Sequence, residues 1–207
     1  MVISVFVYEF IFIFLLNTIP IFGPPTWMVL SFISFTYPVP SLIPFVLVAL
    51  CAATLGRVVL TLSAKYIIRN RFLGQRYKKN MNYLKGRLEK RPYYTSLVFF
   101  VEAFTPLPSD QFFIAYGLTG MKLRYALVPF VMARIFTYSF WVYTASELSK
   151  SVLAQKLTLL SFLSWQFILA ELFILFMLYL FVKIDWEHFI LNRKLRIIEN
   201  IPRMRNK

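Results

Sequence analysis

The chain has 207 residues, of which 59% are hydrophobic, 19% aromatic and only 15% charged, and its mean hydropathy is +0.65. A water-soluble domain distributes charge along its whole length, whereas here most of the 23 lysines and arginines fall in two blocks between long apolar stretches. This excludes a soluble globular domain and indicates an all-α polytopic membrane protein. One cysteine and one histidine are too few for a disulfide framework or a zinc or haem site, so we expect no metal and no cofactor.

Four apolar stretches are long enough to cross a bilayer, because a spanning helix needs about 20 mainly apolar residues. They are residues 2–22, 41–64, 125–146 and 157–182. Two further stretches contain prolines, which remove backbone donors: 22–39, which includes Gly23-Pro24-Pro25, and 93–120, which includes Pro106 and Pro108. A proline-broken apolar segment is typical of a re-entrant hairpin, which enters and leaves the membrane on one side. We therefore expect about four spans and two re-entrant hairpins, with ordinary kinked spans as the alternative.

The two basic blocks predict the orientation. Residues 65–91 hold ten cations and one acid, and residues 183–207 hold seven cations and three acids. By the positive-inside rule both blocks face the cytoplasm. With four spans this places both termini inside, in a multi-pass protein of the plasma membrane, and makes the two hairpins enter from opposite faces. The expected organisation is a membrane core at 1–148, a last span at 149–185 and a basic tail at 186–207.

The segments before and after the basic linker also read as a weak inverted repeat. Each half runs from an acid through a proline pair to an arginine within a span. Glu9, Pro24-Pro25 and Arg57 in the first half correspond to Glu102, Pro106-Leu107-Pro108 and Arg134 in the second. Inverted repeats with broken helices are a common plan of transporters, which bind substrate where the half-helices meet.

The basic linker at 65–92 predicts an amphipathic helix. Its apolar residues recur at intervals of three and four, at Leu73, Tyr77, Met81, Leu84 and Leu88. We expect this helix to lie on the inner leaflet and to bind anionic lipid headgroups. Nucleic-acid binding is the alternative that we do not favour, because the apolar stripe suits lipid better. Membrane lipids are therefore the expected partners, and the sequence leaves open whether the chain forms a homo-oligomer.

Each of the four predicted spans contains one ionisable residue: Glu9, Arg57, Arg134 and Glu171. A charge at the centre of a span costs roughly 2.5–3.5 kcal/mol, so mutual pairing or a wet cavity must compensate for it. Arg57 and Arg134 are expected at similar depth, and two guanidinium groups there suit a phosphate clamp. The alternatives are that Arg57 reaches out to the inner interface and that Arg134 forms an ion pair with Glu9 or Glu171.

The strongest local motif is Glu102-Ala-Phe-Thr-Pro-Leu-Pro-Ser-Asp110. Ser109 is predicted to cap a half-helix whose first turn holds Asp110, and such an amino terminus attracts anions. We expect Pro106, Pro108 and Ser109 to contribute to substrate binding with the two arginines. Glu102 lies among apolar neighbours and is a candidate for proton coupling, as are Asp110, Glu9 and Glu171. Alternatively, Asp110 only completes the cap and Glu102 pairs with an arginine.

The chain resembles the DedA family of membrane proteins, which contain the VTT domain, over most of residues 5–148. The resemblance rests on the Glu102 to Asp110 string, Ala115-Tyr116-Gly117, Met121, residues 130–141, Pro24-Pro25 and Leu55-Gly56-Arg57. It implies two oppositely oriented re-entrant segments and a flippase or scramblase function that moves polyprenyl phosphates or phospholipids, with proton coupling in some members. In many bacterial members an acid stands where this chain has Trp27, so the acidic motif lies in the other half here.

The predicted function is therefore translocation of a lipid phosphate between leaflets, coupled to protons. The alternatives are a small-ion or proton antiporter and a scaffold that transports nothing. The sequence has no phosphate-binding loop, nucleophile elbow or zinc-protease motif, so we do not expect an enzyme.

Overall fold

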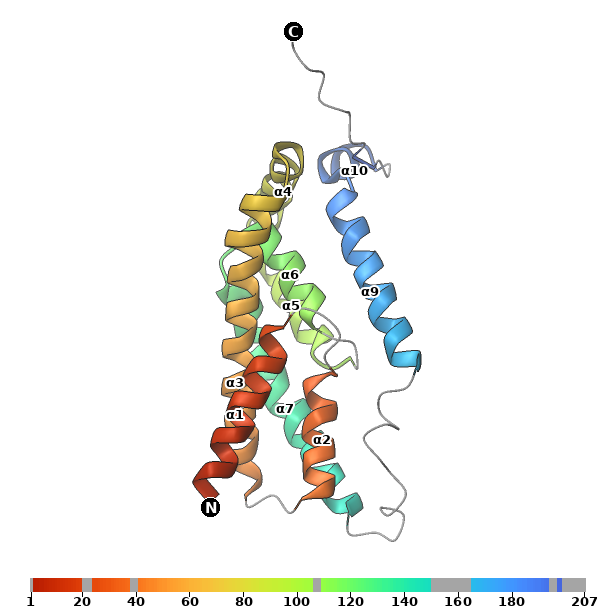
Figure 1. Cartoon of the computed structure of the whole chain (residues 1–207). Coiled ribbons are helices and arrows are strands. Elements are labelled where there is room, and N and C mark those ends of the chain that lie inside the picture. Colours follow the sequence, from red (N-terminus) through yellow and green to blue (C-terminus); the bar gives the residue numbers. More distant parts are fainter. Residues whose placement is uncertain are drawn as a thin grey trace.

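In a computed structural model, the chain is all helical over the residues that the structure describes, which are 2–19, 24–37, 41–105, 109–149, 165–193 and 197–198. In chain order the helices are α1 (Val2–Thr18), α2 (Thr26–Thr36), α3 (Leu42–Ser63), the π-helix η1 (Ala64–Phe72), α4 (Gln75–Leu88), α5 (Pro92–Glu102), α6 (Asp110–Thr119), α7 (Arg124–Ser149), α9 (Trp165–Lys183) and α10 (Trp186–Asn192) (Figure 1).

Two of these helices are long and apolar enough to cross a membrane. One is the continuous helix Leu42–Phe72, which has 31 residues and consists of α3 and η1, and the other is α7, which has 26 residues. They pack against each other and form the centre of the molecule (Figure 1). They correspond to the predicted spans at 41–64 and 125–146, although the first continues into what was expected to be the amphipathic linker.

The other two predicted spans are shorter in the structure. α1 has 17 residues, below the roughly 20 that a full span needs. α9 has 19 residues, and the predicted start of that span at 157–164 lies outside the described residues. The expectation of four full spans is therefore not confirmed. The two proline-containing stretches form only short helices, namely α2 in 22–39 and the pair α5 and α6 in 93–120.

Small residues of α3 allow α1 to approach closely. Ala49, Ala52 and Ala53 are fully buried, and a Cβ on Gly56 would lie only 2.6 Å from the Cβ of Asn17. Small residues four positions apart are the usual means of close helix packing in membranes. Gly56 is near the middle of the 31-residue helix and Asn17 is near the end of α1, so α1 ends about halfway along its neighbour.

The helix packing repeats in an inverted sense. α1 packs on α3 and α2 packs on α7, whereas α5 packs on α7 and α6 packs on α3. Exchanging α1, α2 and α3 for α5, α6 and α7 leaves this pattern unchanged. Figure 1 shows that α1 and α2 extend toward one end of the molecule and that α5 and α6 extend toward the other. The contacts therefore have the relationship expected of an inverted repeat.

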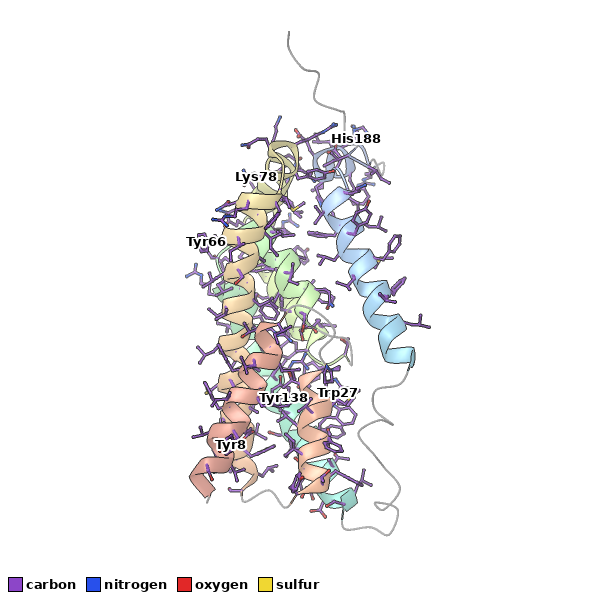
Figure 2. All side chains as sticks on the ribbon, viewed as in Figure 1. Tyr8, Trp27, Tyr66, Lys78, Tyr138 and His188 are labelled. Carbon is purple, nitrogen blue, oxygen red and sulfur yellow. The ribbon has the colours of Figure 1, made fainter. Side chains whose placement is uncertain are left out.

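Both basic segments lie at the same end of the molecule. The amide nitrogen of Asn80 in α4 donates to the carbonyl oxygen of Ile184 at 2.6 Å, and its oxygen accepts from the backbone of Trp186 at 2.8 Å. Figure 2 shows Lys78 and His188 together at this end (Figure 2). The start of α1 lies at the opposite end. The side of the membrane that each end of the molecule faces stays a prediction.

The apolar stripe of α4 has a different partner from the one predicted. Met81 and Leu84 are buried, and α4 packs against α5, α6, α9 and α10. The stripe thus packs against the protein, whereas the placement of this helix on the inner leaflet stays a prediction. The cations on the other side of α4, among them Arg76, Lys79 and Arg87, remain exposed.

Candidate functional site

Arg57 is buried at the middle of the long helix. Its side chain is 6% exposed, and its Nη1 atom lies 2.5 Å from Oδ1 of Asp110, the first residue of α6. The guanidinium also lies over the ring of Phe113, 5.7 Å from the centroid. Arg57 lies fifteen positions from each end of the continuous helix Leu42–Phe72. The side chain of Arg57 is thus buried within the protein and paired with Asp110.

Arg134 occupies the corresponding place in α7. Its Nη2 atom donates to Oγ of Ser109 at 2.6 Å and lies 3.6 Å from Oε1 of Glu102. Its guanidinium carbon lies 5.3 Å from the ring centroid of Phe130 and 5.6 Å from that of Tyr138. The predicted internal ion pair of Arg134 exists, and its partner is Glu102; among the described residues Glu9 forms no ion pair, and the side chain of Glu171 lies outside the described part of the chain.

The turn between α5 and α6 supplies both acids. α5 ends at Glu102 and α6 begins at Asp110, so the carboxylates stand at the two sides of one turn. The hydroxyl of Thr105 donates to the backbone oxygen of Glu102 at 2.7 Å and tightens the end of α5. Ser109 holds the predicted N-cap position but makes no capping hydrogen bond, because its hydroxyl accepts from Arg134. Pro106 and Pro108, predicted to bind substrate, lie outside the described residues.

The four charged groups form one cluster with balanced charge. Glu102 is in electrostatic reach of Asp110 and both arginines, and all four side chains are at most 9% exposed. Two positive and two negative charges compensate for each other, which lowers the cost of keeping them in an apolar region. The Nε atoms of both arginines lack a hydrogen-bond partner. The cluster therefore keeps unused capacity to bind a polar group.

The cluster lies between two hydrophobic cores. One core contains Ile13, Leu30, Ala53 and Tyr138, and the other contains Leu60, Phe113 and Phe130. Arg57 lies between Ala53 and Leu60 along α3, and Arg134 lies between Phe130 and Tyr138 along α7. Figure 2 shows Tyr138 inside the bundle at the start of the core that α1 and α2 share. The polar groups thus mark the level at which the two halves meet.

The first half places a polar pair at the same level, and sequence reasoning missed it. The side chains of Asn17 and Thr26 hydrogen-bond to each other, with Nδ2 of Asn17 2.9 Å from Oγ1 of Thr26. They join the end of α1 to the beginning of α2, as Glu102 and Asp110 flank the turn of the second half. A polar residue on each side of Gly23-Pro24-Pro25 was the signal that could have identified them.

Of the two remaining predicted acids, the structure describes the side chain of Glu9 only, and it does not join the cluster. Glu9 is buried in α1, its carboxylate oxygens have no hydrogen-bond partner, and none of the ion pairs among the described residues includes it. Glu171 belongs to α9, but its side chain lies outside the described part of the chain. Of the four proton-coupling candidates, the structure brings Glu102 and Asp110 together with the arginines.

A groove leads from the outer surface of the hairpin to Glu102. It has a volume of about 390 Å³ and is lined by Leu97, Val98, Val101, Glu102, Thr105 and Phe112. Leu97, Val98 and Val101 are each about half exposed, as expected of side chains that face lipid. Glu102 is thus the one charged residue that lines this groove between α5 and α6.

The geometry of the site and the comparisons with known proteins each give a negative finding. Within the described ranges, no three His, Cys, Asp or Glu side chains are grouped so that they could hold a metal ion. No family model, no curated protein and no solved structure matches this chain.

Proposed function

We propose that this protein is a membrane transporter that moves the phosphate headgroup of a lipid between leaflets and is coupled to protons. In this proposal α3 with η1, α7 and α9 cross the bilayer. The pairs α1–α2 and α5–α6 are re-entrant hairpins that enter from opposite faces and turn near the midplane. The end with α4 and α10 is cytoplasmic by its positive charge, so the start of α1 faces outward. The resemblance to the DedA family remains a prediction that is consistent with this plan.

The observation that carries the proposal is the pairing of Arg57 and Arg134 with acids on one hairpin turn. Both arginines stay protonated, so an acid can release them only by taking up a proton or by moving away. When Glu102 is protonated, the cluster has one positive charge in excess. The single charge of a phosphodiester restores neutrality, and the planar guanidinium of Arg134 suits two of its oxygens. Loss of the proton from Glu102 then returns the carboxylate to Arg134 and expels the phosphate.

The groove beside Glu102 supports a lipid as the substrate. It opens between α5 and α6 onto the surface that faces lipid, and its lining is apolar apart from Glu102 and Thr105. A headgroup can approach the cluster from the side while the acyl chains remain in the bilayer. A phosphate that crosses hydrocarbon unaided loses all its hydrogen bonds with water, at a large cost in free energy. The cluster replaces some of these hydrogen bonds.

The test uses proteoliposomes that contain a fluorescent lipid, whose label in the outer leaflet is destroyed by an impermeant reductant. The parent protein is expected to expose more label than the one-leaflet fraction, with a rate that depends on pH. Glu102→Gln should remove the pH dependence, and Arg134→Lys should slow transfer, because a lysine keeps the charge but loses the fork. Glu9→Gln is the matched control, since Glu9 is equally buried but does not face the arginines.

Three results would overturn the proposal. If vesicles with folded, inserted parent protein expose only the one-leaflet fraction of the lipid label, lipid transfer is excluded. Proton flux measured in the same vesicles then tests the antiporter hypothesis. If Arg134→Lys moves lipid as fast as the parent, the arginine is not part of the path. If Glu9→Gln removes the pH dependence and Glu102→Gln keeps it, the coupling acid lies in the other half.

A further inference from the structure

A cleft with a volume of about 650 Å³ lies between α5 and the first half of α7. It adjoins the groove at Glu102, since Leu97 lines both. Its walls include the side chains of Leu97, Phe100, Val128 and Met132, which are 37–57% exposed. Tyr93, Arg124 and Tyr125 line it near the cytoplasmic end. The cleft is therefore apolar along its length and polar where α7 begins.

A proline of α7 lines this cleft. Pro129 lies inside α7 and has no N–H group, so the carbonyl oxygen of Tyr125 has no donor from its own helix. The hydroxyl of Ser96 in α5 donates to that oxygen at 3.0 Å. A freed carbonyl within a membrane must be satisfied by the protein, and this hydrogen bond does so across the cleft. It fixes the distance between α5 and α7 while the helix surfaces beyond it stay apart.

The cation at the end of the cleft is held in place. Nη2 of Arg124 donates to the hydroxyl of Tyr125 at 2.9 Å, and the guanidinium lies over the Tyr125 ring, 4.9 Å from its centroid. Arg124 is exposed, so most of its donors face outward. A fixed, solvent-accessible guanidinium beside an apolar cleft suits the phosphate of a lipid whose acyl chain fills the cleft.

The dimensions agree with this occupant. Arg124 to Met132 covers eight residues of helix, or about 12 Å at 1.5 Å per residue. One leaflet contributes about 15 Å of hydrocarbon. If Arg124 lies at the headgroup level, the cleft therefore runs through most of the cytoplasmic leaflet and stops short of the midplane. Its depth fits one acyl chain of a lipid that belongs to that leaflet.

We infer that the cleft between α5 and α7 is a binding site for an anionic phospholipid of the leaflet at the basic end, with the phosphate on Arg124 and one acyl chain along Leu97, Val128 and Met132. The site is separate from the charge cluster and does not require the lipid to cross the membrane. The bound lipid fills the gap that Pro129 opens and couples the position of the second hairpin to the composition of the leaflet.

The experiment uses the full chain in vesicles with a phosphatidylglycerol that carries a photoactivatable group on its acyl chain, followed by mass spectrometry of the labelled peptides. We expect adducts enriched on residues 93–102 and 124–132 relative to the lipid-facing residues of α1. Arg124→Ala should lower this enrichment roughly fivefold, the effect of one cation at an anionic interface. Lys122→Ala is the matched control, because Lys122 is an exposed cation nearby that does not line the cleft.

A second variant tests the position of the lipid's acyl chain independently of charge. Met132→Trp adds bulk to an exposed wall and should displace the label from the cleft without unfolding the protein. Equal labelling of all lipid-facing helices would overturn the inference, as would enrichment that survives both Arg124→Ala and Met132→Trp. Equal enrichment with the zwitterionic phosphatidylcholine probe, or cross-links between two copies of the chain through the cleft, would also overturn it.

Discussion

Gly117 of α6 lies against Thr61 of α3 so closely that a Cβ at Gly117 would stand 2.5 Å from the Thr61 carbonyl oxygen. This backbone approach holds the second hairpin on the long helix and brings Asp110, two turns earlier in α6, to Arg57. Gly117→Ala is therefore expected to lower the melting temperature of the purified protein and to weaken the ion pair. An added methyl group cannot be accommodated without moving one of the two helices.

Gly86→Ala is the control for this change, since a Cβ at Gly86 would have nothing within 4 Å. Alanine is favoured over glycine inside a helix by roughly 0.5–1 kcal/mol, so Gly86→Ala in α4 should leave the melting temperature unchanged or raise it slightly. If Gly117→Ala is as stable as Gly86→Ala in thermal unfolding, the close packing of α6 on α3 is wrong.

The pairing of Arg57 with Asp110 predicts strong coupling between the two residues. Removing one partner of a buried ion pair leaves the other charge uncompensated, which costs about 3–5 kcal/mol. Asp110→Asn and Arg57→Gln should each destabilise the protein strongly, whereas the double variant should be more stable than either single one. Reversible unfolding in detergent measures all three. Additive effects of the two substitutions would show that the residues do not interact.

Sequence reasoning identified the residues of the charge cluster but not their partners. Arg57, Arg134, Glu102 and Asp110 were conspicuous because charges are rare in apolar segments. Which acid faces which arginine depends on how α6 packs on α3, and the glycine contact that sets this has no clear signal in a single sequence. The prediction of a Ser109 cap failed for the same reason, because Arg134 arrives from a distant part of the chain and takes the hydroxyl.

The fold was predicted best for the segments whose positions depend on hydropathy alone. The two long helices correspond to predicted spans, but residues 2–22 were interpreted as a full span because apolar length does not reveal where a helix ends. The contact of Asn17 with Gly56 shows that α1 stops about halfway along the continuous helix Leu42–Phe72. The periodicity of α4 predicted an apolar face correctly, yet it could not distinguish lipid from the protein surface that covers Met81.

The hydrogen bond between Ser96 and Tyr125 predicts that the stability cost of Ser96→Ala depends on Pro129. In the parent protein Ser96→Ala leaves the carbonyl of Tyr125 without a donor, which should cost about 1–3 kcal/mol of stability. In a Pro129→Ala background, residue 129 regains its N–H and can donate to that carbonyl itself. Ser96→Ala should then cost much less, and a thermal unfolding cycle of the four proteins measures the difference. Equal costs in both backgrounds would contradict this role for Ser96.

The proposed topology predicts which positions are accessible from the same side of the membrane. If α5 and α6 form a re-entrant hairpin, the residues before and after it face the same compartment. Lys90→Cys and Lys122→Cys, both exposed, should react with an impermeant maleimide from the side of the basic linker. Tyr37→Cys, at the end of α2, should react from the opposite side, because α3 and η1 cross the membrane between it and the linker. Each variant is made with Cys51→Ser, which removes the exposed native thiol. Labelling of positions 90 and 122 from opposite sides would mean that 93–120 crosses the membrane, and the inverted arrangement of the two hairpins would then be wrong.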